Sequence, residues 1–505
     1  MTSASPAPGA PTPPIAIAGE AAAATAHLRA PLVLLDDGFL ERLGQACADV
    51  RLDPGERAEA SRDWWPLAMI WATQGQVGQV AGAVARPTST DEVAAVLRLC
   101  DDARVPVTPA AGRSSVVGGT VPVHGGVVLD LTGLSGLGEV DVTSGLVEVW
   151  AGTFGDRLEE ELQERHGLTI GHWPQSMALS TVGGWLACRG AGQLSNRYGK
   201  VEDLVVGLEV VLADGSVVRT GGQPRQAVGP DLTQLFVGAE GTLGVITRAW
   251  FQAWPKPTAT GRSAWGFATF SEALDAMRRI IQRDARTAVL RLYDGIESQR
   301  NFGVDPSVNV LLAYDEGDPL VVQAGMAIVD DVCAGADRLD DALVEQWFGH
   351  RNNVDALEAL ITKGYVVDTM EITGPWSALD AIYAAATEAI AAVPGTLAVS
   401  AHQSHSYVTG GCLYFTFAGG VEPDDRDRFY TEAWDAGTRA VLAGGGSLSH
   451  HHGVGLNRAR FVADALGTGL PVLAALKATL DPNGICNPGK LGLPDPFGDV
   501  RWPAP

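Results

Sequence analysis

The pattern of hydrophobic and polar positions along this chain changes near residue 257. Before it, short apolar runs predict β-strands at Val105–Pro109, Gly126–Leu131 and Leu146–Trp150. Apolar residues from Val93 to Cys100 recur at helical spacing behind the capping box Ser89-Thr90-Asp91-Glu92, which predicts a helix. The first half is therefore predicted to be rich in β-structure, with short helices.

Two further patterns predict local turns in this half. The amphipathic segment Asp156–His166 predicts a helix that Gly167 ends. Val205–Thr220 predicts a hairpin that turns at Asp214-Gly215.

The N-terminal region divides into two parts. Residues 1–30 are rich in Ala and Pro and carry almost no charge, so we expect a disordered tail. Residues 31–82 read as helical and carry an aromatic cluster: Trp64, Trp65 and Trp71. The cluster either packs in the core, which we favour, or makes a shallow membrane contact.

A proline-rich, polar stretch from Trp254 to Arg262 predicts a domain boundary. Beyond it a strand–helix–strand rhythm runs over residues 267–293 and returns over residues 365–418. This rhythm favours an antiparallel sheet with flanking helices. The predicted fold class is α+β, with a β-rich module followed by a second domain.

Composition narrows the function classes. The chain has 505 residues and a formal charge of −23, and such an acidic surface argues against binding to nucleic acid. Its six cysteines lie far apart without a CxxC pair, which is typical of reduced thiols in a cytoplasmic protein. No apolar run approaches about 18–20 residues, so we expect no transmembrane helix.

Three segments rich in glycine and small residues follow one another between Pro109 and Ile246. The first, Pro109–Gly119, follows a strand and exposes backbone N–H groups that suit a diphosphate, although it has neither the GxxxxGK[ST] nor the GxGxxG spacing. The second is Pro174–Trp185, which continues through Arg189–Gly192 and Tyr198–Asp203, and the third is Gly238–Ile246. Each alone could be a surface turn, but their order together favours a bound cofactor with a flat ring.

Histidines supply the candidate chemistry. His450-His451-His452 is either a metal-binding or exposed tract or a proton-transfer site. Three adjacent imidazoles are not expected to face one way, so we expect one or two in a site. No cysteine or spaced histidine lies nearby in the sequence, so we predict no metal.

Two other polar residues lie on predicted strands. Tyr414 is either a core tyrosine or part of a site. Arg291 is a lone cation on the apolar strand Val289–Tyr293, so it needs either an internal salt bridge or an anionic substrate.

Taken together, these segments resemble the flavoproteins of the vanillyl-alcohol oxidase type, which bind FAD through a two-subdomain, PCMH-type module. The resemblance spans about Arg86 to Leu491. Within that family the chain is similar to the alkyldihydroxyacetonephosphate synthases. The segments that carry this similarity are Thr181–Trp185, Gly199–Val206, Ile372–Trp376, Cys412–Phe415 and Ser447–Gly455.

The resemblance implies a division of the chain. It places a FAD-binding domain at residues 31–256, a cap domain with an antiparallel sheet at 257–445, and a C-terminal segment at 446–505 that returns to the active site. FAD is expected to be non-covalent, because the loop lacks a histidine or cysteine at the usual linking place. The expected cofactor-binding residues are Pro109, Ala110, Ala111, Gly112, Arg113, Ser114, Ser115, Pro174, Ser176, Ser180, Thr181, Gly183, Gly184, Arg189, Tyr198, Glu240, Gly241, Thr242, Gly244, Val245 and Ile246.

The resemblance also implies roles. Tyr414, His450, His451 and His452 are expected to be catalytic, and Arg291, His402 and His405 to bind substrate. The implied reaction exchanges the acyl chain of an acyl-dihydroxyacetone phosphate for a fatty alcohol, in ether-lipid synthesis. The stretch Ala401-His402-Gln403 departs from the synthase pattern, which has an arginine there.

Two other functions stay open. One is a FAD-dependent dehydrogenase or oxidase of a 2-hydroxy acid or another alcohol, and the other is a flavin-binding protein without catalysis. The expected partner is a small-molecule or lipid-like substrate. A homodimer and a peripheral contact with a membrane are further open alternatives. We expect the protein to be located in the cytoplasm.

Overall fold

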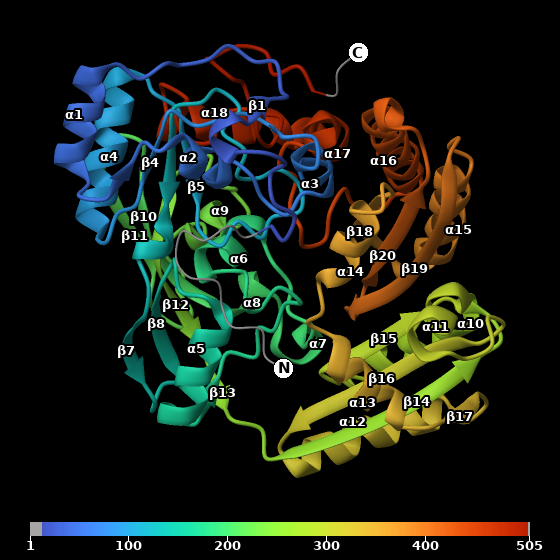
Figure 1. Cartoon of the computed structure of the whole chain (residues 1–505). Helices are drawn as coiled ribbons and strands as arrows, with labels where there is room; N and C mark the ends of the chain where they lie inside the picture. Colours follow the sequence, from blue (N-terminus) through green and yellow to red (C-terminus); the bar gives the residue numbers. More distant parts are fainter. Residues whose placement is uncertain (1–12, 503–505) are drawn as a thin grey trace.

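The computed structural model describes residues 13–502, with the backbone alone of residue 355, and its sheets form two bodies (Figure 1). The first body contains a four-stranded sheet in the order β2 (Val50–Arg51), β4 (Ala83–Ala85), β6 (Val127–Asp130), β5 (Val107–Ala110). It also contains a five-stranded antiparallel sheet in the order β11 (Val217–Gly221), β10 (Val205–Val211), β12 (Val245–Gln252), β8 (Leu146–Trp150), β7 (Leu137–Asp141).

The second body, yellow to orange in Figure 1, is built on one antiparallel sheet of seven strands. Its order is β17 (Asp337–Leu339), β14 (Ala259–Phe267), β16 (Asn309–Gly317), β15 (Val289–Tyr293), β19 (Thr396–Ser406), β20 (Gly410–Gly419), β18 (Val366–Pro375). Two short pairs complete the sheets: β1 (Thr25–Ala26) with β3 (Gln76–Val77), and β13 (Trp254–Pro255) with β9 (Leu168–Thr169).

Helices connect and cover these sheets. In the first body they are α1 (Asp37–Ala46), α2 (Pro54–Ala60), α3 (Pro66–Ala72), α4 (Thr90–Ala103), α5 (Gly155–Glu161), α6 (Val182–Cys188), α7 (Ser195–Tyr198), α8 (Val201–Leu204) and α9 (Thr233–Phe236). In the rest of the chain they are α10 (Phe270–Gln282), α11 (Gly295–Phe302), α12 (Pro319–Val332), α13 (Ala342–His350), α14 (Asp355–Ile361), α15 (Trp376–Ala391), α16 (Arg426–Ala443), α17 (Val462–Leu466) and α18 (Leu470–Leu480).

The local patterns read from the sequence are confirmed. Helix α4 begins where Ser89 Oγ accepts from the Glu92 N–H at 3.2 Å. Helix α5 continues as one π-helical turn to His166 and ends at Gly167 with φ of 64°. The β10–β11 hairpin turns through Gly215 with φ of 80°, a conformation that glycine adopts without strain.

The expectation of a disordered tail is wrong for residues 13–30, whereas residues 1–12 lie outside the described part of the chain. Ile15, Ile17 and Leu28 are buried in the same core cluster as Trp65 and Trp71. These isolated apolar side chains gain a partner from α3 that the local composition does not reveal. Because Trp65 and Trp71 are fully buried, the cluster is core, and the membrane-contact alternative is wrong for them.

The two faces of the seven-stranded sheet differ in chemistry. On one face Leu290, Leu292, Leu413 and Phe415 belong to the core cluster that also contains buried residues of α10 and α15. Since successive strand residues point to opposite faces, Arg291 and Tyr414 lie on the other face. The alternation along the strands thus places apolar residues on the face that packs against the helices. It places polar residues on the opposite face, which carries the site.

The C-terminal segment packs back onto the first body. Val107 pairs with Cys486 in an isolated bridge, and Lys490 Nζ donates to Val121 O at 2.9 Å. Asn487 Nδ2 donates to Gly119 O at 3.1 Å and to Glu240 O at 2.7 Å. One side chain therefore joins the first and third of the glycine-rich segments.

One helical stretch in the described residues, Ala459–Leu480, is long and apolar enough to cross a membrane by length and composition. One such stretch is no clear transmembrane span, so it does not contradict the expectation that the chain has no transmembrane helix. The stretch is interrupted at Gly467–Gly469, and its Lys477 is buried, with Nζ donating to Thr242 O at 2.8 Å. Length and composition of a single segment are weak evidence for a membrane span.

Candidate active site

The polar face of the seven-stranded sheet carries a row of chemically active side chains. Strand register pairs Glu371 with Tyr414, Tyr414 with His402, and His402 with Tyr293. Directly paired residues point to the same face, so the row crosses β18, β20, β19 and β15. The ring of Tyr414 stacks on that of His402, with centroids 4.7 Å apart.

The triple histidine lies in a turn that Glu371 holds over this row. One oxygen of Glu371, Oε1, accepts from the N–H groups of His450, His451 and His452 at 3.2, 3.0 and 2.7 Å. Its other oxygen pairs with the guanidinium of Arg458, and both side chains are fully buried. Burial alone would raise the pKa of Glu371, but Arg458 and the neighbouring histidines hold it well below its usual value.

Glu240, from the first body, holds the far side of the same turn. It accepts from the N–H groups of Val454 and Gly455, the latter at 2.8 Å. Gly453 has φ of 82°, and a Cβ there would lie 2.5 Å from Glu240 Oε1. The glycine after the triple histidine is therefore required both by its conformation and by the close approach of this carboxylate.

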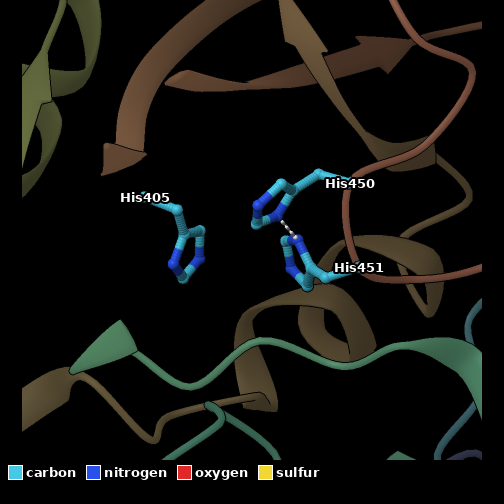
Figure 2. Close-up of side chains that lie close together, drawn as sticks. All are labelled: His405, His450 and His451. Carbon is cyan, nitrogen blue, oxygen red and sulfur yellow. Dashed lines mark hydrogen bonds between the residues drawn. The ribbon is translucent and has the colours of Figure 1, made fainter. Parts of the chain in front are cut away.

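Three imidazoles converge at the site: His405, His450 and His451 (Figure 2). One ring nitrogen of each lies within 4.8 Å of the others, and His450 Nδ1 is 2.9 Å from His451 Nδ1. The pairing of β19 with β20 shifts register between Gln403 and Ser406, and His405 lies within this bulge. Sequence spacing gave no sign that His405 approaches the triple histidine.

Two of the three rings, His450 and His451, join His405 in the cluster, as expected, whereas His452 Nδ1 lies 3.6 Å from Glu371 Oε2. The His450–His451 centroids are 5.1 Å apart and the His451–His452 centroids 4.4 Å. The tight turn around Glu371 explains this, because three consecutive N–H groups point to a single oxygen.

Two tyrosines contact the cluster. Tyr407 Oη lies 2.6 Å from His450 Nε2, whereas Tyr414 donates its hydroxyl to Thr369 Oγ1 at 3.0 Å. Sequence reasoning selected Tyr414 and missed Tyr407. The only available signal was the position of Tyr407 at the end of the segment that also contains His402 and His405.

Arg291 lies next to His402 on the same face. Its Nη2 donates to His402 Nε2 at 2.6 Å, and His402 Nδ1 lies 2.8 Å from Glu297 Oε2. Because Nε2 accepts, His402 is the neutral tautomer that donates from Nδ1. Among the residues that the structure describes, Arg291 forms no ion pair, and its buried Nε has no hydrogen-bond partner.

Burial governs the protonation of the histidines. It holds the pKa values of His405, His450 and His451 well below the usual value, helped for His405 by the nearby Arg291 and Lys200 charges. Burial likewise lowers the pKa of His452 to about 4. These imidazoles are therefore neutral near pH 7, the form that accepts a proton.

The three glycine-rich segments meet beside this cluster. A Cβ at Gly112 would lie 2.1 Å from Leu179 O, and one at Gly241 would lie 2.6 Å from the Pro109 ring. The first segment therefore contacts both the second and the third. The residues expected to bind FAD come from separate parts of the chain, and the fold brings them into one place.

Several features of these segments suit a dinucleotide. No hydrogen bond is recorded within residues 13–502 for the N–H groups of Gly112, Ser114 and Ser115. Thr181 Oγ1 is buried without a partner in the same range, and a Cβ at the exposed Gly184 would meet nothing closer than Thr181 Oγ1 at 3.4 Å. Unpaired donors and open space at glycine are what a diphosphate and its ring require.

Other residues expected to bind the cofactor make contacts within the protein. Ser180 Oγ accepts from Trp185 Nε1 at 2.7 Å, and Thr242 Oγ1 donates to Ala239 O at 2.7 Å. Tyr198 donates its hydroxyl to Glu316 Oε1 in the second body at 2.8 Å. Arg189 lies 3.6 Å from Glu202, so these side chains support the segments.

Comparison with known proteins agrees with this architecture. Residues 81–221 match the model of a FAD binding domain, and residues 256–491 match that of the FAD linked oxidases, C-terminal domain. A solved alkyldihydroxyacetonephosphate synthase superposes with a TM-score of 0.77 at 26% identity, covering 92% of this chain and 87% of that one. The predicted fold class is confirmed.

Several relatives are similar to this chain over more than four fifths of its length. The FAD-linked oxidoreductase YgcU of Escherichia coli O157:H7 is 32% identical over 82% of this chain and 89% of its own. The alkyldihydroxyacetonephosphate synthase of Dictyostelium discoideum is 29% identical over 83% and 74%. The glycolate oxidase subunit GlcD of Bacillus subtilis is 28% identical over 83% and 91%.

Proposed function

The chain belongs to the family of FAD-linked oxidases, with FAD as its cofactor, and we propose that within this family it oxidises the hydroxyl group of a small 2-hydroxy acid. The observation that carries the proposal is the guanidinium of Arg291 beside a cluster of neutral imidazoles. The guanidinium would hold an anion, and an imidazole would accept a proton. Glycolate, named for the Bacillus subtilis relative, is an acid of this class.

Arg291 is the group that would bind the carboxylate. It keeps a buried Nε without a partner in the described residues, and its charge is not neutralised there by an ion pair. His402 accepts one of its other donors and fixes the plane of the guanidinium. A planar fork in a fixed orientation suits two oxygens of one carboxylate.

The imidazoles would take the hydroxyl proton of the substrate. His451 Nε2 has no recorded partner in the described chain, while its Nδ1 lies 2.9 Å from His450 Nδ1. His450 Nε2 continues the series to the Tyr407 hydroxyl at 2.6 Å. A proton accepted at His451 Nε2 would leave His451 as an imidazolium, whose Nδ1–H donates to His450 Nδ1 while His450 Nε2–H donates to the Tyr407 oxygen.

FAD, when bound, supplies an acceptor for the hydride that leaves the substrate carbon. The residues that would hold it are the N–H groups of Gly112, Ser114 and Ser115, together with Thr181 and the open face at Gly184. The protein's own contribution is to orient the substrate through Arg291 and to receive the proton.

A second function, acyl-for-alkyl exchange on a ketone phosphate, is favoured by the segment Ser447–Gly455, which is similar to the synthases. Against it, His402 stands in the stretch where the synthase pattern has an arginine. A dianionic phosphate is held best by more than one guanidinium. We therefore rank this exchange second.

Anaerobic mixing of the purified flavoprotein with glycolate, D-lactate or L-lactate tests the proposal. We expect persistent loss of flavin absorbance with at least one acid and none with its methyl ester, which lacks the charge that Arg291 binds. Arg291→Lys should raise KM by roughly 10–100-fold, the cost of a charged hydrogen bond, while the exposed Arg286→Lys should not.

The exchange reaction is followed in parallel with labelled fatty alcohol. If no 2-hydroxy acid bleaches the flavin and label enters an ether product, the second function replaces the first. If the ester reacts as well as the acid, Arg291 does not recognise a carboxylate.

A further inference from the structure

A buried cation, Lys200, lies where the first body meets the imidazole cluster. It directly follows Gly199 in the second glycine-rich segment, and α8 begins after it. Its Nζ donates to His450 O at 2.7 Å and lies 3.1 Å from Glu202 Oε1. The ammonium group therefore joins a segment expected to bind FAD to the turn that carries the triple histidine.

The charge of Lys200 reaches imidazoles of both bodies. Burial is the main cause of their low pKa values, and the positive charge of Lys200 lowers these pKa values further. The imidazoles concerned are those of His172, His405, His450 and His451. His172 belongs to the first body, where its ring centroid lies 4.5 Å from that of Trp185 in α6. Lys200 is thus near α6 as well as near the site on the sheet.

The carboxylates near Lys200 do not cancel its charge at the cluster. Glu202 also lies 3.6 Å from Arg189 Nε, so two cations share one carboxylate. Asp203 accepts the backbone N–H of Lys200 at 2.9 Å but is exposed, so water screens its charge. Within the described residues, Lys200 is the one charged group that shifts the pKa of His172. A positive charge therefore faces the space between α6 and the imidazoles.

Bound FAD needs such a charge when it is reduced. Oxidation of a substrate alcohol breaks its C–H bond, and the hydrogen leaves with both bonding electrons for the flavin, while the hydroxyl proton goes to an imidazole. The flavin ring thereby gains a negative charge. An unpaired charge in a buried site is costly, and a fixed cation nearby offsets that cost.

The other cations described around the cluster have partners or another task. Arg291 would bind the substrate, and Arg458 is paired with the fully buried Glu371. We propose that Lys200 stabilises the reduced, negatively charged flavin and so raises the reduction potential of bound FAD. This role requires only bound FAD, whichever substrate reduces it. Its test therefore uses no substrate, and it can fail while the proposed oxidation of a 2-hydroxy acid stands.

The reduction potential of the flavin-containing protein is measured by equilibration with a reference dye. Lys200→Met keeps the length of the side chain and removes its charge. The equilibrium constant for reduction should fall by roughly 10–100-fold, the cost of a charge-assisted hydrogen bond. This fall corresponds to a potential lower by about 30–60 mV. Lys363→Met removes an exposed lysine, so it changes the total charge equally and should leave the potential unchanged.

Glu202→Gln separates an electrostatic role of Lys200 from a structural one. It removes the negative partner of Lys200, so the potential should rise. If the ion pair were purely structural, its loss would shift the potential in the same direction in both variants. Lys200→Arg keeps the charge and should retain a potential near that of the wild type.

The dependence of the wild-type potential on pH needs no variant. A negatively charged reduced flavin takes up one proton with two electrons, so the potential should fall by about 30 mV per pH unit between about pH 6 and 8. A fall of about 59 mV per pH unit would mean two protons and a neutral reduced flavin, and would overturn the proposal. An unchanged potential in Lys200→Met, or a lowered one in Glu202→Gln, would overturn it too.

Discussion

Two tyrosines face the imidazoles, and each uses its hydroxyl differently. Tyr407 reaches His450 Nε2, whereas Tyr414 gives its hydrogen to Thr369 and offers its ring to His402. Tyr407 is therefore the hydroxyl connected to the proposed proton path. Tyr414 shapes the site mainly through its ring.

This difference predicts the order of two conservative variants. Tyr407→Phe should lower kcat by roughly 10–100-fold, because a hydrogen bond to a reacting imidazole is lost while the ring is retained. Tyr414→Phe should lower kcat less. Steady-state kinetics with equal FAD content checks this, with the exposed Tyr365→Phe as the control. A larger loss in Tyr414→Phe would show that Tyr414 carries the proton.

The sequence could identify the chemically active residue types but not all of their partners. The triple histidine, Tyr414 and Arg291 were recognisable because they interrupt apolar strands or glycine-rich turns. Glu371, Arg458 and Tyr407 were missed, since each gains its role from a neighbour distant in sequence. Likewise, a β-bulge places His405, and single-residue register is not visible in an alternating pattern.

At the scale of elements, the first turn of helix α6 contains two adjacent glycines, Gly183 and Gly184, whose surroundings differ. A Cβ at Gly183 would lie 2.9 Å from Ala151 Cβ and 3.1 Å from Ala151 O. Glycine at this position therefore lets α6 pack closely against Ala151, which directly follows β8. A Cβ at Gly184 would enter open space beside Thr181. The first glycine serves packing, and the second leaves room for a ligand.

Gly184→Val is therefore expected to lower FAD content while leaving the helical signal unchanged. Gly183→Val should instead destabilise the protein by about 1–3 kcal/mol through overpacking. The flavin-to-protein absorbance ratio after dialysis and far-ultraviolet circular dichroism measure the two effects. Gly349→Val places the same side chain in open space on α13 and serves as the control. Full flavin occupancy in Gly184→Val would remove this face from the cofactor site.

Most elements were predictable because their signals are local. The cap of α4, the end of the helix at Gly167 and the β10–β11 turn each depend on residues within one or two turns. The segment before residue 30 was not predictable, because Ile15 and Ile17 are buried in a core cluster whose other members, including residues of α3, are distant in sequence. Local composition measures the propensity for disorder but not the presence of a distant partner.

At the scale of the whole molecule, segments far apart in sequence meet at Asp368 of β18. Trp434 Nε1 and the Tyr430 hydroxyl, both from α16, donate to Asp368 Oδ2, the former at 3.0 Å. Trp65 Nε1, at the start of α3, donates to Tyr430 Oη at 2.8 Å. The N-terminal region is thus joined to the second body through one buried carboxyl group.

Asp368 should make the stability of the molecule depend on pH. Burial raises its pKa to about 7, against about 3.9 for an unfolded chain, although its hydrogen bonds act in the opposite direction. Between these values the folded state holds a proton that the unfolded state has released. The free energy of unfolding should therefore fall as pH rises from about 4 to 7, by up to about 1.4 kcal/mol per pH unit, and level off above.

Asp368→Asn removes this titration and keeps the shape of the side chain. Part of the difference in the free energy of unfolding between the two proteins should not depend on pH, since the amide cannot accept every hydrogen bond of the carboxyl group. The informative quantity is the difference in slope: thermal unfolding across pH 4–8 should show the stability of the wild type falling toward that of Asp368→Asn as pH rises. Asp63, whose pKa burial raises to about 6, contributes equally to both proteins and cancels. Parallel curves would mean that Asp368 has the same pKa in the folded and the unfolded state, and that the junction between the two bodies does not respond to pH.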